Sequence, residues 1–242
     1  MRIPRIYTEQ PLAQGLSLEL EEGPSRHIGR VLRMQPGREL TLFNGTGGEF
    51  QARVKQVEKR SVTVQVEAYT PDNRESPLSL ELAIGLSRGE RMDWVLQKAT
   101  ELGVTRIKPL LTERTEVKLS GERLEKKFNH WRQIIISACE QCQRNLVPEL
   151  APPQKLEEWL SSNRNALSLV LHHRDSRGLP EGQAPESVAL LVGPEGGLSE
   201  PEIAQAREAG CAPLTLGPRV LRTETAPVAA ISLVQYRWGD FS

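Results

Sequence analysis

From residue 78 onward, short apolar runs alternate with longer amphipathic segments along the chain. The runs include LELAIGL, LSLVL and SVALLV. Such runs are typical of strands that are buried on both faces of a parallel sheet, because helices cover both sides. The alternation predicts an α/β domain with a mostly parallel sheet, and it limits the fold more than any other feature of the chain.

Helices are expected between these runs, at residues 91–102, 124–142 and 224–236. In the first helix, Met92 and Leu96 lie on one side, and Gly103 is the expected C-terminal stop. A further helix is expected to begin at Ser199, because Ser199 and Glu202 form an S-x-x-E capping box. The strands before these helices are therefore expected to end in loops at one edge of the sheet.

The first 70 residues show a different pattern, in which apolar and polar residues alternate with the period of a strand. LTLF, EFQARVKQV and SVTVQVEAY are the expected strands, and the glycine-rich turn at 44–48 joins the first two as a hairpin. This pattern predicts a small barrel-like domain.

One short helix is expected within this first part, in the segment SRHIGRVLRMQPG. Ser25 is its expected N-cap, and Ile28, Val31 and Leu32 are expected to face inward. The polar segment TPDNRESP at 70–77 is the expected linker, because prolines flank it. The expected domains are therefore 1–72 and 73–242.

Charge and cysteine content limit the possible partners and compartments. The chain carries 31 basic and 31 acidic residues, so its net charge does not predict a nucleic-acid partner. Basic residues outnumber acidic ones in 1–70 and 86–147, which fits either a polyanion partner or solvated helix faces. No apolar stretch reaches about 18 residues and the N-terminus has no signal-like core, so no membrane partner is expected. Three cysteines without a paired framework favour a cytoplasmic location.

The loop VGPEGG follows an apolar run and precedes the helix at Ser199, a position where many loops hold phosphate. It has neither the P-loop nor the G-x-G-x-x-G pattern. Pro194 lacks the backbone donor that a phosphate cradle uses, and Glu195 adds a negative charge. The loop therefore favours a ligand that lies close to the backbone and is uncharged or partly cationic. The alternative is a tight connection that needs glycine at positive φ.

Two more loops of this kind follow neighbouring predicted strands. LTLGPRVLRTETA continues from Leu214, with Arg219 and Arg222 before the last helix, and the remaining strand ends at His172. In open α/β sheets, ligands bind outside the carboxyl ends of the strands. The three loops are therefore expected to form one crevice.

These loops resemble the signature of the RsmE family of 16S ribosomal RNA methyltransferases, which belongs to the SPOUT superfamily. The motifs LLVGPEGGLSEPEI and LGPRVLRTETA carry the resemblance, and MRIPRIY, HIGRVLRM, SRGERMDWVLQKATELGV and SACEQCQRNLVPE extend it over the whole chain. The resemblance implies a PUA-like RNA-binding barrel followed by a SPOUT α/β domain with a trefoil knot. It also implies S-adenosylmethionine as cofactor, a homodimer in which both subunits shape the site, and methylation of N3 of one uridine in small-subunit rRNA, on assembled 30S particles.

The resemblance assigns a cofactor-binding role to residues of the three loops. These are Leu171, His172, Gly193, Pro194, Glu195, Gly196, Gly197, Leu216, Gly217, Val220, Leu221 and Arg222. S-adenosylmethionine has no phosphate and carries a cationic sulfonium, so a loop with Glu195 and no lysine suits it. Whether Glu195 contacts the cofactor or only the following helix is left open.

The expected catalytic residues are Arg222 and Glu224. Methylation of N3 requires loss of the imide proton, and the negative charge then spreads onto both carbonyl oxygens of the uracil. Arg222 is expected to stabilise that charge, with a phosphate clamp or a salt bridge to Glu224 as the alternatives. Glu224, Glu195 and His172 are the candidates for the general base. Proximity to the methyl donor is expected to supply much of the acceleration.

RNA contacts are expected from basic residues of both domains, together with one asparagine. They are Arg2, Arg5, Arg30, Arg33, Arg88, Arg91, Arg144 and Asn145. For each of them the alternative is a surface residue without an RNA contact. The C-x-x-C at Cys139 and Cys142 has no second pair beside it, so no metal site is expected.

Two other functions compete with a methyltransferase. A noncatalytic, ribosome-associated RNA-binding protein would need no cofactor crevice. A nucleotide-dependent dehydrogenase or kinase would need the phosphate-binding fingerprints that the glycine loop lacks. Binding of S-adenosylmethionine separates the three.

Overall fold

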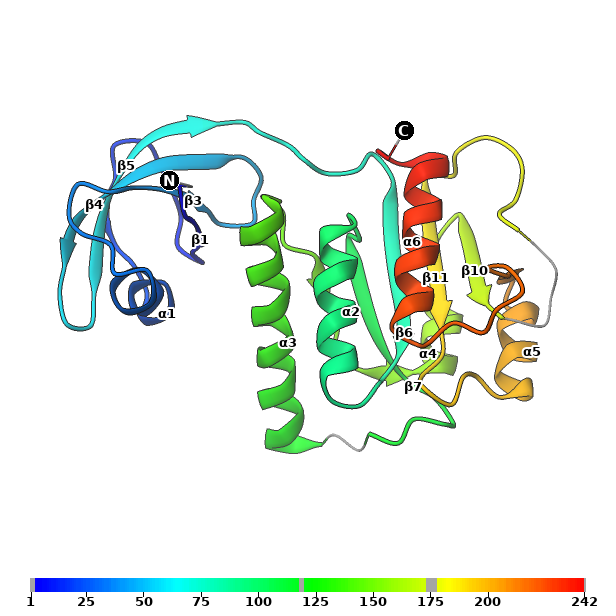
Figure 1. Ribbon diagram of the computed structural model, residues 1–242. Coiled ribbons are helices and arrows are strands. Elements are labelled where there is room, and N and C mark those ends of the chain that lie inside the picture. The colour runs from blue at the N-terminus through cyan, green and yellow to red at the C-terminus, as the bar shows by residue number, and fades with distance from the viewer. Residues whose placement is uncertain (1–2, 118–119, 173–177, 242) are drawn as a thin grey trace. The chain divides into compact units, whose positions relative to one another are not determined.

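The computed structural model describes residues 3–117, 120–172 and 178–241 (Figure 1). It divides into two compact units, which are Met1–Glu75 with Cys139–Val147 and Ser76–Ala138 with Pro148–Ser242. The division between Glu75 and Ser76 falls inside the predicted linker. A boundary at residue 72 stays a prediction, as does the trefoil knot. Arg2 lies outside the described residues.

The first unit is built on a five-stranded sheet in the order β1-β3-β4-β5-β2. Its strands are β1 (Arg5–Tyr7), β2 (Ser17–Glu19), β3 (Glu39–Phe43), β4 (Glu49–Val57) and β5 (Val62–Thr70). Alternate residues of β4 and β5 are buried, as the two-residue period predicts, and they form a core with Ile6, Leu40 and Ile28. The predicted hairpin between β3 and β4 is confirmed, because the two strands pair antiparallel.

The helix of this unit differs from the prediction. It consists of α1 (Glu22–Arg26) followed by the π-helix η1 (His27–Val31). The bond from the Leu32 N–H to the His27 carbonyl spans five residues, so the 3.6-residue spacing fails here. Ile28 is fully buried as predicted, but Val31 is 66% and Leu32 38% exposed, and their predicted inward orientation is wrong.

Ser25 is also not the N-cap that the sequence suggests. It lies inside α1 and is buried. Its hydroxyl donates to the Leu20 carbonyl (2.8 Å) and accepts from the Val62 N–H (3.1 Å). Ser25 therefore ties the helix to the beginning of β5.

The second unit contains the predicted parallel sheet, in the order β12-β10-β11-β6-β7-β8, with β9 also paired to β7. All of its strand pairs are parallel. The strands are β6 (Ser79–Gly85), β7 (Arg106–Leu111), β8 (Glu149–Leu150), β9 (Gln154–Lys155), β10 (Leu167–Leu171), β11 (Ser187–Val192) and β12 (Ala212–Leu214).

Helices cover both faces of this sheet (Figure 1). They are α2 (Glu90–Glu101), α3 (Gly121–Cys142, whose last residues belong to the first unit), α4 (Leu156–Ser162), α5 (Glu200–Glu208) and α6 (Thr225–Trp238). Helices α4 and α5 pack with Ala83, Val170 and Leu191 in one core. Helix α2 lies against α6, which contacts β11. Within the described residues, none of the helices combines the length and apolar character that a membrane crossing needs.

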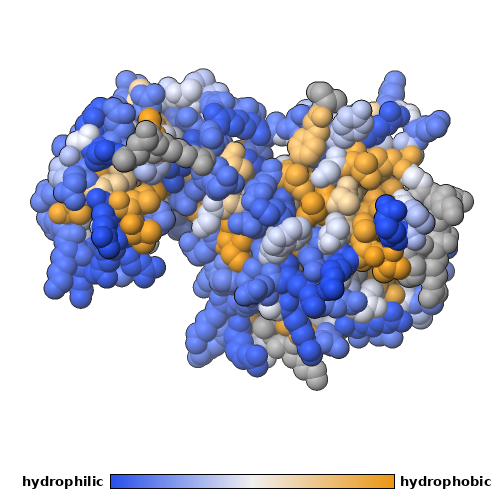
Figure 2. Space-filling view, viewed as in Figure 1, coloured by the Kyte–Doolittle hydropathy of each residue, from blue (hydrophilic) through white to orange (hydrophobic). Residues whose placement is uncertain are grey.

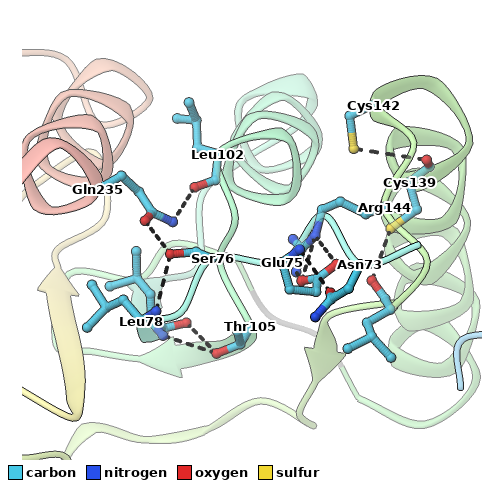
Figure 3. A network of polar contacts seen from close by, with 12 residues as sticks. Asn73, Glu75, Ser76, Leu78, Leu102, Thr105, Cys139, Cys142, Arg144 and Gln235 are labelled. Carbon is cyan, nitrogen blue, oxygen red and sulfur yellow. Dashed lines mark hydrogen bonds and ion pairs between the residues drawn. The ribbon is translucent and has the colours of Figure 1, made fainter. Parts of the chain in front are cut away.

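A buried glutamine fixes the last helix in this unit (Figure 3). The Gln235 side chain of α6 donates to the Leu102 carbonyl (2.8 Å) and accepts from the Ser76 hydroxyl (2.7 Å). Gly103 leaves room for it, since a Cβ there would lie 2.5 Å from the Gln235 Nε2. This anchor fixes the C-terminal part of α6 against the end of α2 and the beginning of the unit.

Candidate functional site

A cavity of about 310 Å³ lies at the carboxyl ends of β10, β11 and β12. We call it the strand-end cleft. These strand ends meet because β10 pairs with both β11 and β12 in parallel. All predicted cofactor residues except Arg222 line the cleft, so the expected crevice is present at this edge of the sheet. The other lining residues are Arg114, Val192, Leu198, Glu200, Ile203, Leu214, Arg219, Thr223 and Ala226.

The loop VGPEGG forms one wall through its backbone. A Cβ on Gly193 would lie 2.7 Å from the Leu198 nitrogen, and a Cβ on Gly85 would lie 2.5 Å from the Pro194 nitrogen. Gly197 has φ +68° and its N–H donates to the Pro194 carbonyl (2.8 Å). The loop is therefore a tight connection that needs glycine, and it also lines a cavity large enough for a small ligand.

Arg114, which also lines the cleft, holds the same loop. Its guanidinium donates to the Gly196 carbonyl (2.7 Å), and its Cβ would lie 3.1 Å from a Cβ on Gly196. Sequence reasoning missed Arg114, because it lies after β7 and far along the chain from the loop. A strand-end position on a neighbouring strand is the signal that could have found it.

The helix behind this loop satisfies its own first turn. The predicted capping box of α5 is confirmed, since the Glu202 carboxylate accepts from the Ser199 N–H (2.8 Å) and the Ser199 hydroxyl accepts from the Glu202 N–H (3.4 Å). The second Glu202 oxygen accepts from the Glu113 N–H (2.7 Å). These donors are therefore not free for a phosphate, which agrees with the expectation of a different ligand.

Glu195 lines the cleft, but its carboxylate is bound to the N-terminus of α2. It accepts from the Arg88 backbone N–H (2.8 Å) and from the Arg91 guanidinium (3.0 Å). Burial raises the pKa of Glu195, but the hydrogen bonds from Arg88 and Arg91 outweigh it and hold the pKa below the ordinary value. The charge of Glu195 is therefore used inside the protein, which leaves its backbone for a ligand.

The loop LGPRVLRTETA forms the opposite wall. Gly217 has φ +81° and Val220 is 78% exposed. Arg222 is exposed and is not among the lining residues, which differs from the expectation that it forms part of the wall. Its carbonyl accepts from the Thr225 and Ala226 N–H groups, so its backbone forms part of the turn into α6.

Arg222 and Glu224 do not pair as the alternative reading suggested. Glu224 lies 3.9 Å from the Arg91 guanidinium, at the start of α6. Over residues 3–117, 120–172 and 178–241, the Arg222 guanidinium has no ion pair or hydrogen bond. Arg91 thus joins both glycine-containing loops, through Glu195 and Glu224, while Arg222 keeps its charge available.

The predicted RNA residues fall into three groups. Arg30 and Arg33 are exposed, whereas Arg88 and Arg91 are exposed but paired with Glu116 and Glu195. Within the first unit, Arg5, Arg144 and Asn145 are turned inward.

The inward group joins the end of α3 to the first sheet. Arg5 pairs with Glu49 (2.5 Å) and donates to the Asn145 side chain (2.5 Å), while Arg144 pairs with Glu75 (Figure 3). Arg144 is 4% and Asn145 2% exposed. Their burial favours a structural role over the expected RNA contact.

The neighbouring thiols behave as packed side chains. Cys139 is buried, and burial raises its pKa to about 12. Its Sγ lies 3.8 Å from the Leu146 carbonyl, which it can reach as a weak donor (Figure 3). A thiol in this state is a poor nucleophile and a poor metal ligand.

Comparison with known proteins assigns both units to RNA methyltransferase families. Residues 74–235 match the family described as RNA methyltransferase domain, and residues 21–67 match RNA methyltransferase PUA domain. The chain is 36% identical over 245 residues to ribosomal RNA small subunit methyltransferase E of Buchnera aphidicola subsp. Schizaphis graminum, with 100% of this chain and 99% of that protein covered. It is 31% identical to the protein of that name from Bacillus subtilis, with 95% and 94% covered.

Two solved structures are similar to this chain over the full length of both proteins. A methyltransferase from Legionella pneumophila in complex with the cofactor SAM has a TM-score of 0.97 and 46% identity, with 100% of both chains covered. Ribosomal RNA small subunit methyltransferase E from Neisseria gonorrhoeae, bound to S-adenosylmethionine, has a TM-score of 0.93 and 40% identity at the same coverage. The fold and the cleft thus define an RNA methyltransferase with a PUA domain. The chain belongs to the ribosomal RNA small subunit methyltransferase E (RsmE) family.

Proposed function

We propose that this protein transfers a methyl group from S-adenosylmethionine to N3 of a uridine in 16S rRNA of the small ribosomal subunit. The strand-end cleft carries this proposal, because its walls suit the cofactor. Leu171, Leu216 and Leu221 offer apolar contacts for an adenine, and the glycine backbone allows close approach. Full-length relatives of the same fold are bound to S-adenosylmethionine.

Different residues around the cleft bind the reactants and stabilise the charge that develops in the reaction. The cofactor, when bound, supplies an electrophilic methyl group. The loop backbones and leucines hold and orient the two reactants, which lowers the entropic part of the barrier. Arg222 stabilises the negative charge that develops on the uracil oxygens once N3 loses its proton, because its guanidinium is unpaired among the described residues.

The base that removes the N3 proton is one of three groups near the cleft. His172 lines the cleft and is half-buried. Glu195 and Glu224 both lie within ion-pair distance of Arg91, at 3.0 and 3.9 Å. Of these, Glu224 precedes α6 directly after Arg222 and Thr223, so we assign it first.

A second copy of the chain is proposed to complete the site. Trp94 of α2 and Leu233 and Tyr236 of α6 are 41%, 44% and 66% exposed. Figure 2 shows hydrophobic side chains gathered over this part of the second unit. Exposed apolar surface of this kind is typical of an interface, and α6 leads directly from the loop that carries Arg222. Sedimentation at micromolar concentration tests for the dimer.

A protein that acts on ribosomal particles works in the cytoplasm, and we propose that location for this protein.

The test uses small subunits that lack the modification. Labelled cofactor and purified protein are added, the labelled RNA is digested, and the modified nucleotide is mapped. We expect one labelled position, a uridine methylated at N3. Label at another atom, or RNA binding without any transfer, would contradict the proposal, and the second result would favour the noncatalytic RNA-binding protein.

A further inference from the structure

Two arginines line the strand-end cleft, and among the described residues only Arg114 has a partner there. Arg114 donates to the Gly196 carbonyl (2.7 Å). Arg219 belongs to the loop LGPRVLRTETA and is exposed. Within residues 3–117, 120–172 and 178–241, its side chain forms no ion pair or hydrogen bond. The family resemblance assigns no role to Arg219, and its charge is available to a ligand in the cleft.

The acidic residues of the cleft do not neutralise Arg219. Glu195 accepts from the Arg88 N–H (2.8 Å) and from the Arg91 guanidinium (3.0 Å), so its charge is already paired. Glu200 also lines the cleft and lies in the first turn of α5, which follows the loop VGPEGG. Like charges repel, so the anionic group of a ligand is disfavoured beside Glu200 and favoured beside Arg219.

The backbone at the start of α5 already uses the donors that an anion would need. The Gly197 N–H donates to the Pro194 carbonyl (2.8 Å). The Ser199 N–H donates to the Glu202 carboxylate (2.8 Å), and the Glu202 N–H donates to the Ser199 hydroxyl (3.4 Å). N–H groups before and within the first turn of a helix are common anion sites, but these ones are occupied. An anion in the cleft is therefore better received by Arg219.

The proposed cofactor brings one anionic group into the cleft. S-adenosylmethionine ends in an amino-acid tail that carries a carboxylate and an ammonium group. The leucines of the cleft suit its adenine, but they cannot pair with a carboxylate. Removing a carboxylate from water without a partner is costly. A guanidinium binds a carboxylate through two parallel hydrogen bonds, so an arginine without a partner is the side chain that matches this group.

We propose that Arg219 binds the carboxylate of S-adenosylmethionine and makes the cleft selective for a cofactor with an intact amino-acid tail. This inference rests on the proposed function, from which the cofactor follows. It gives different roles to two arginines of one loop, because Arg219 lines the cleft and Arg222 does not. Arg219 holds the cofactor, and Arg222 is left for the uracil. A tail that is held at its end also restricts the orientations of the methyl group.

The experiment compares two ligands that differ in one group. Decarboxylated S-adenosylmethionine keeps the adenosine, the sulfonium and the amine but lacks the carboxylate. We expect the unaltered protein to bind S-adenosylmethionine roughly tenfold or more tightly than the decarboxylated form, because only the first pairs with a charged side chain. In Arg219→Gln we expect this preference to fall to about twofold or less, with little change in affinity for the decarboxylated form. Calorimetric titration measures both affinities.

Two further variants control for the loss of charge. Arg123 is an exposed arginine of α3 that does not line the cleft and has no ion pair among the described residues. Arg123→Gln is expected to keep the preference. Arg219→Lys is expected to keep part of it, because lysine retains the charge but not the paired donors. An unchanged preference in Arg219→Gln, or an equal loss of affinity for both ligands, would overturn the inference.

RNA affinity and methyl transfer, measured on the same samples, separate the alternatives. Weaker binding of a 16S rRNA fragment by Arg219→Gln, with an unchanged cofactor preference, would assign Arg219 to an RNA phosphate and overturn the inference. Loss of the preference in Arg219→Gln, without transfer to small subunits by the unaltered protein, would support the inference and contradict the proposed function. Normal transfer by an unaltered protein that binds both ligands equally would overturn the inference and support the proposed function.

Discussion

The strand-end cleft of the second unit and the cavity of the first unit between α1–η1 and the β4–β5 turn differ in how their charges are paired. In the cleft, Glu195 is bound to Arg91 and Arg114 is bound to a loop carbonyl, whereas Arg219 lines the cleft without an ion pair among the described residues. In the first-unit cavity, the four lining cations Arg26, Arg30, Lys59 and Arg60 have no ion pair among the described residues. Paired charge leaves much of the cleft wall to backbone and apolar side chains, which suits one small ligand, whereas unpaired positive charge attracts anions.

Arg222, like Arg219, has no ion pair among the described residues, and the loss of Arg222 tests whether an unpaired cation beside the cleft contributes to methyl transfer. We expect Arg222→Ala to lower methyl transfer by roughly 10²–10³-fold, because the developing charge on uracil loses its partner. Cofactor affinity, measured by calorimetry, is expected to be retained or to fall modestly. Arg222→Lys is the control and keeps part of the rate. Unchanged transfer by Arg222→Ala would refute the role.

Gly193 tests whether the cleft binds through its backbone. Gly193→Ala places a Cβ 2.7 Å from the Leu198 nitrogen, so the loop must shift. A displacement of about 1 Å in an active site can lower the reaction rate about 10²-fold. We expect a loss of comparable size in cofactor affinity. Gly178→Ala is the matched control, since its Cβ would meet nothing within 4 Å. Equal cofactor affinity in both variants would show that the backbone does not hold the ligand.

Arg91 tests whether paired charge shapes the cleft. We expect Arg91→Gln to lower cofactor affinity about two- to fivefold, because a partly exposed ion pair contributes at most about 1 kcal/mol. Arg88→Gln is the control. It loses the exposed pair with Glu116 but keeps the backbone N–H that donates to Glu195. If Arg88→Gln weakened cofactor binding as much as Arg91→Gln, the loops would not depend on this pair.

The smallest effect concerns pH. Because the pKa of Glu195 is held below the ordinary value, its contribution to stability is present above the usual glutamate pKa of about 4.3 and is lost as pH falls through the lowered value. We therefore expect the melting-temperature difference between the unaltered protein and Glu195→Gln to be constant from pH 8 to about 5. Calorimetric scans across that range check this, and a difference that disappears near neutral pH would contradict the pairing.

The sequence predicted the parts of the fold that depend on local pattern. The apolar runs and the Ser199–Glu202 capping box each lie within a few consecutive residues of the sequence. Both are present in the structure. The predicted inward orientation of Val31 and Leu32 was wrong because the π-helix has more residues per turn than an α-helix. The spacing of apolar residues in the sequence gives no sign of this change.

The position of the cleft could also be predicted from the sequence, but the charge pairing around it could not. Parallel strand ends meet at one edge, so the loops at His172, Gly193 and Gly217 could be placed together. Charge pairing could not be predicted, since Glu195 and Arg91 are 104 residues apart. The burial of Arg144 against Glu75 was missed likewise, because a basic residue after a helix has the same local pattern whether it is buried or exposed.

The central claim is that the strand-end cleft holds S-adenosylmethionine and not a nucleotide phosphate. Calorimetric titration of the unaltered protein with S-adenosylmethionine, and separately with ATP, tests it most directly. We expect saturable binding of S-adenosylmethionine that Gly193→Ala weakens and Gly178→Ala does not, with no comparable binding of ATP. Absence of S-adenosylmethionine binding, or equal binding of ATP, would contradict it.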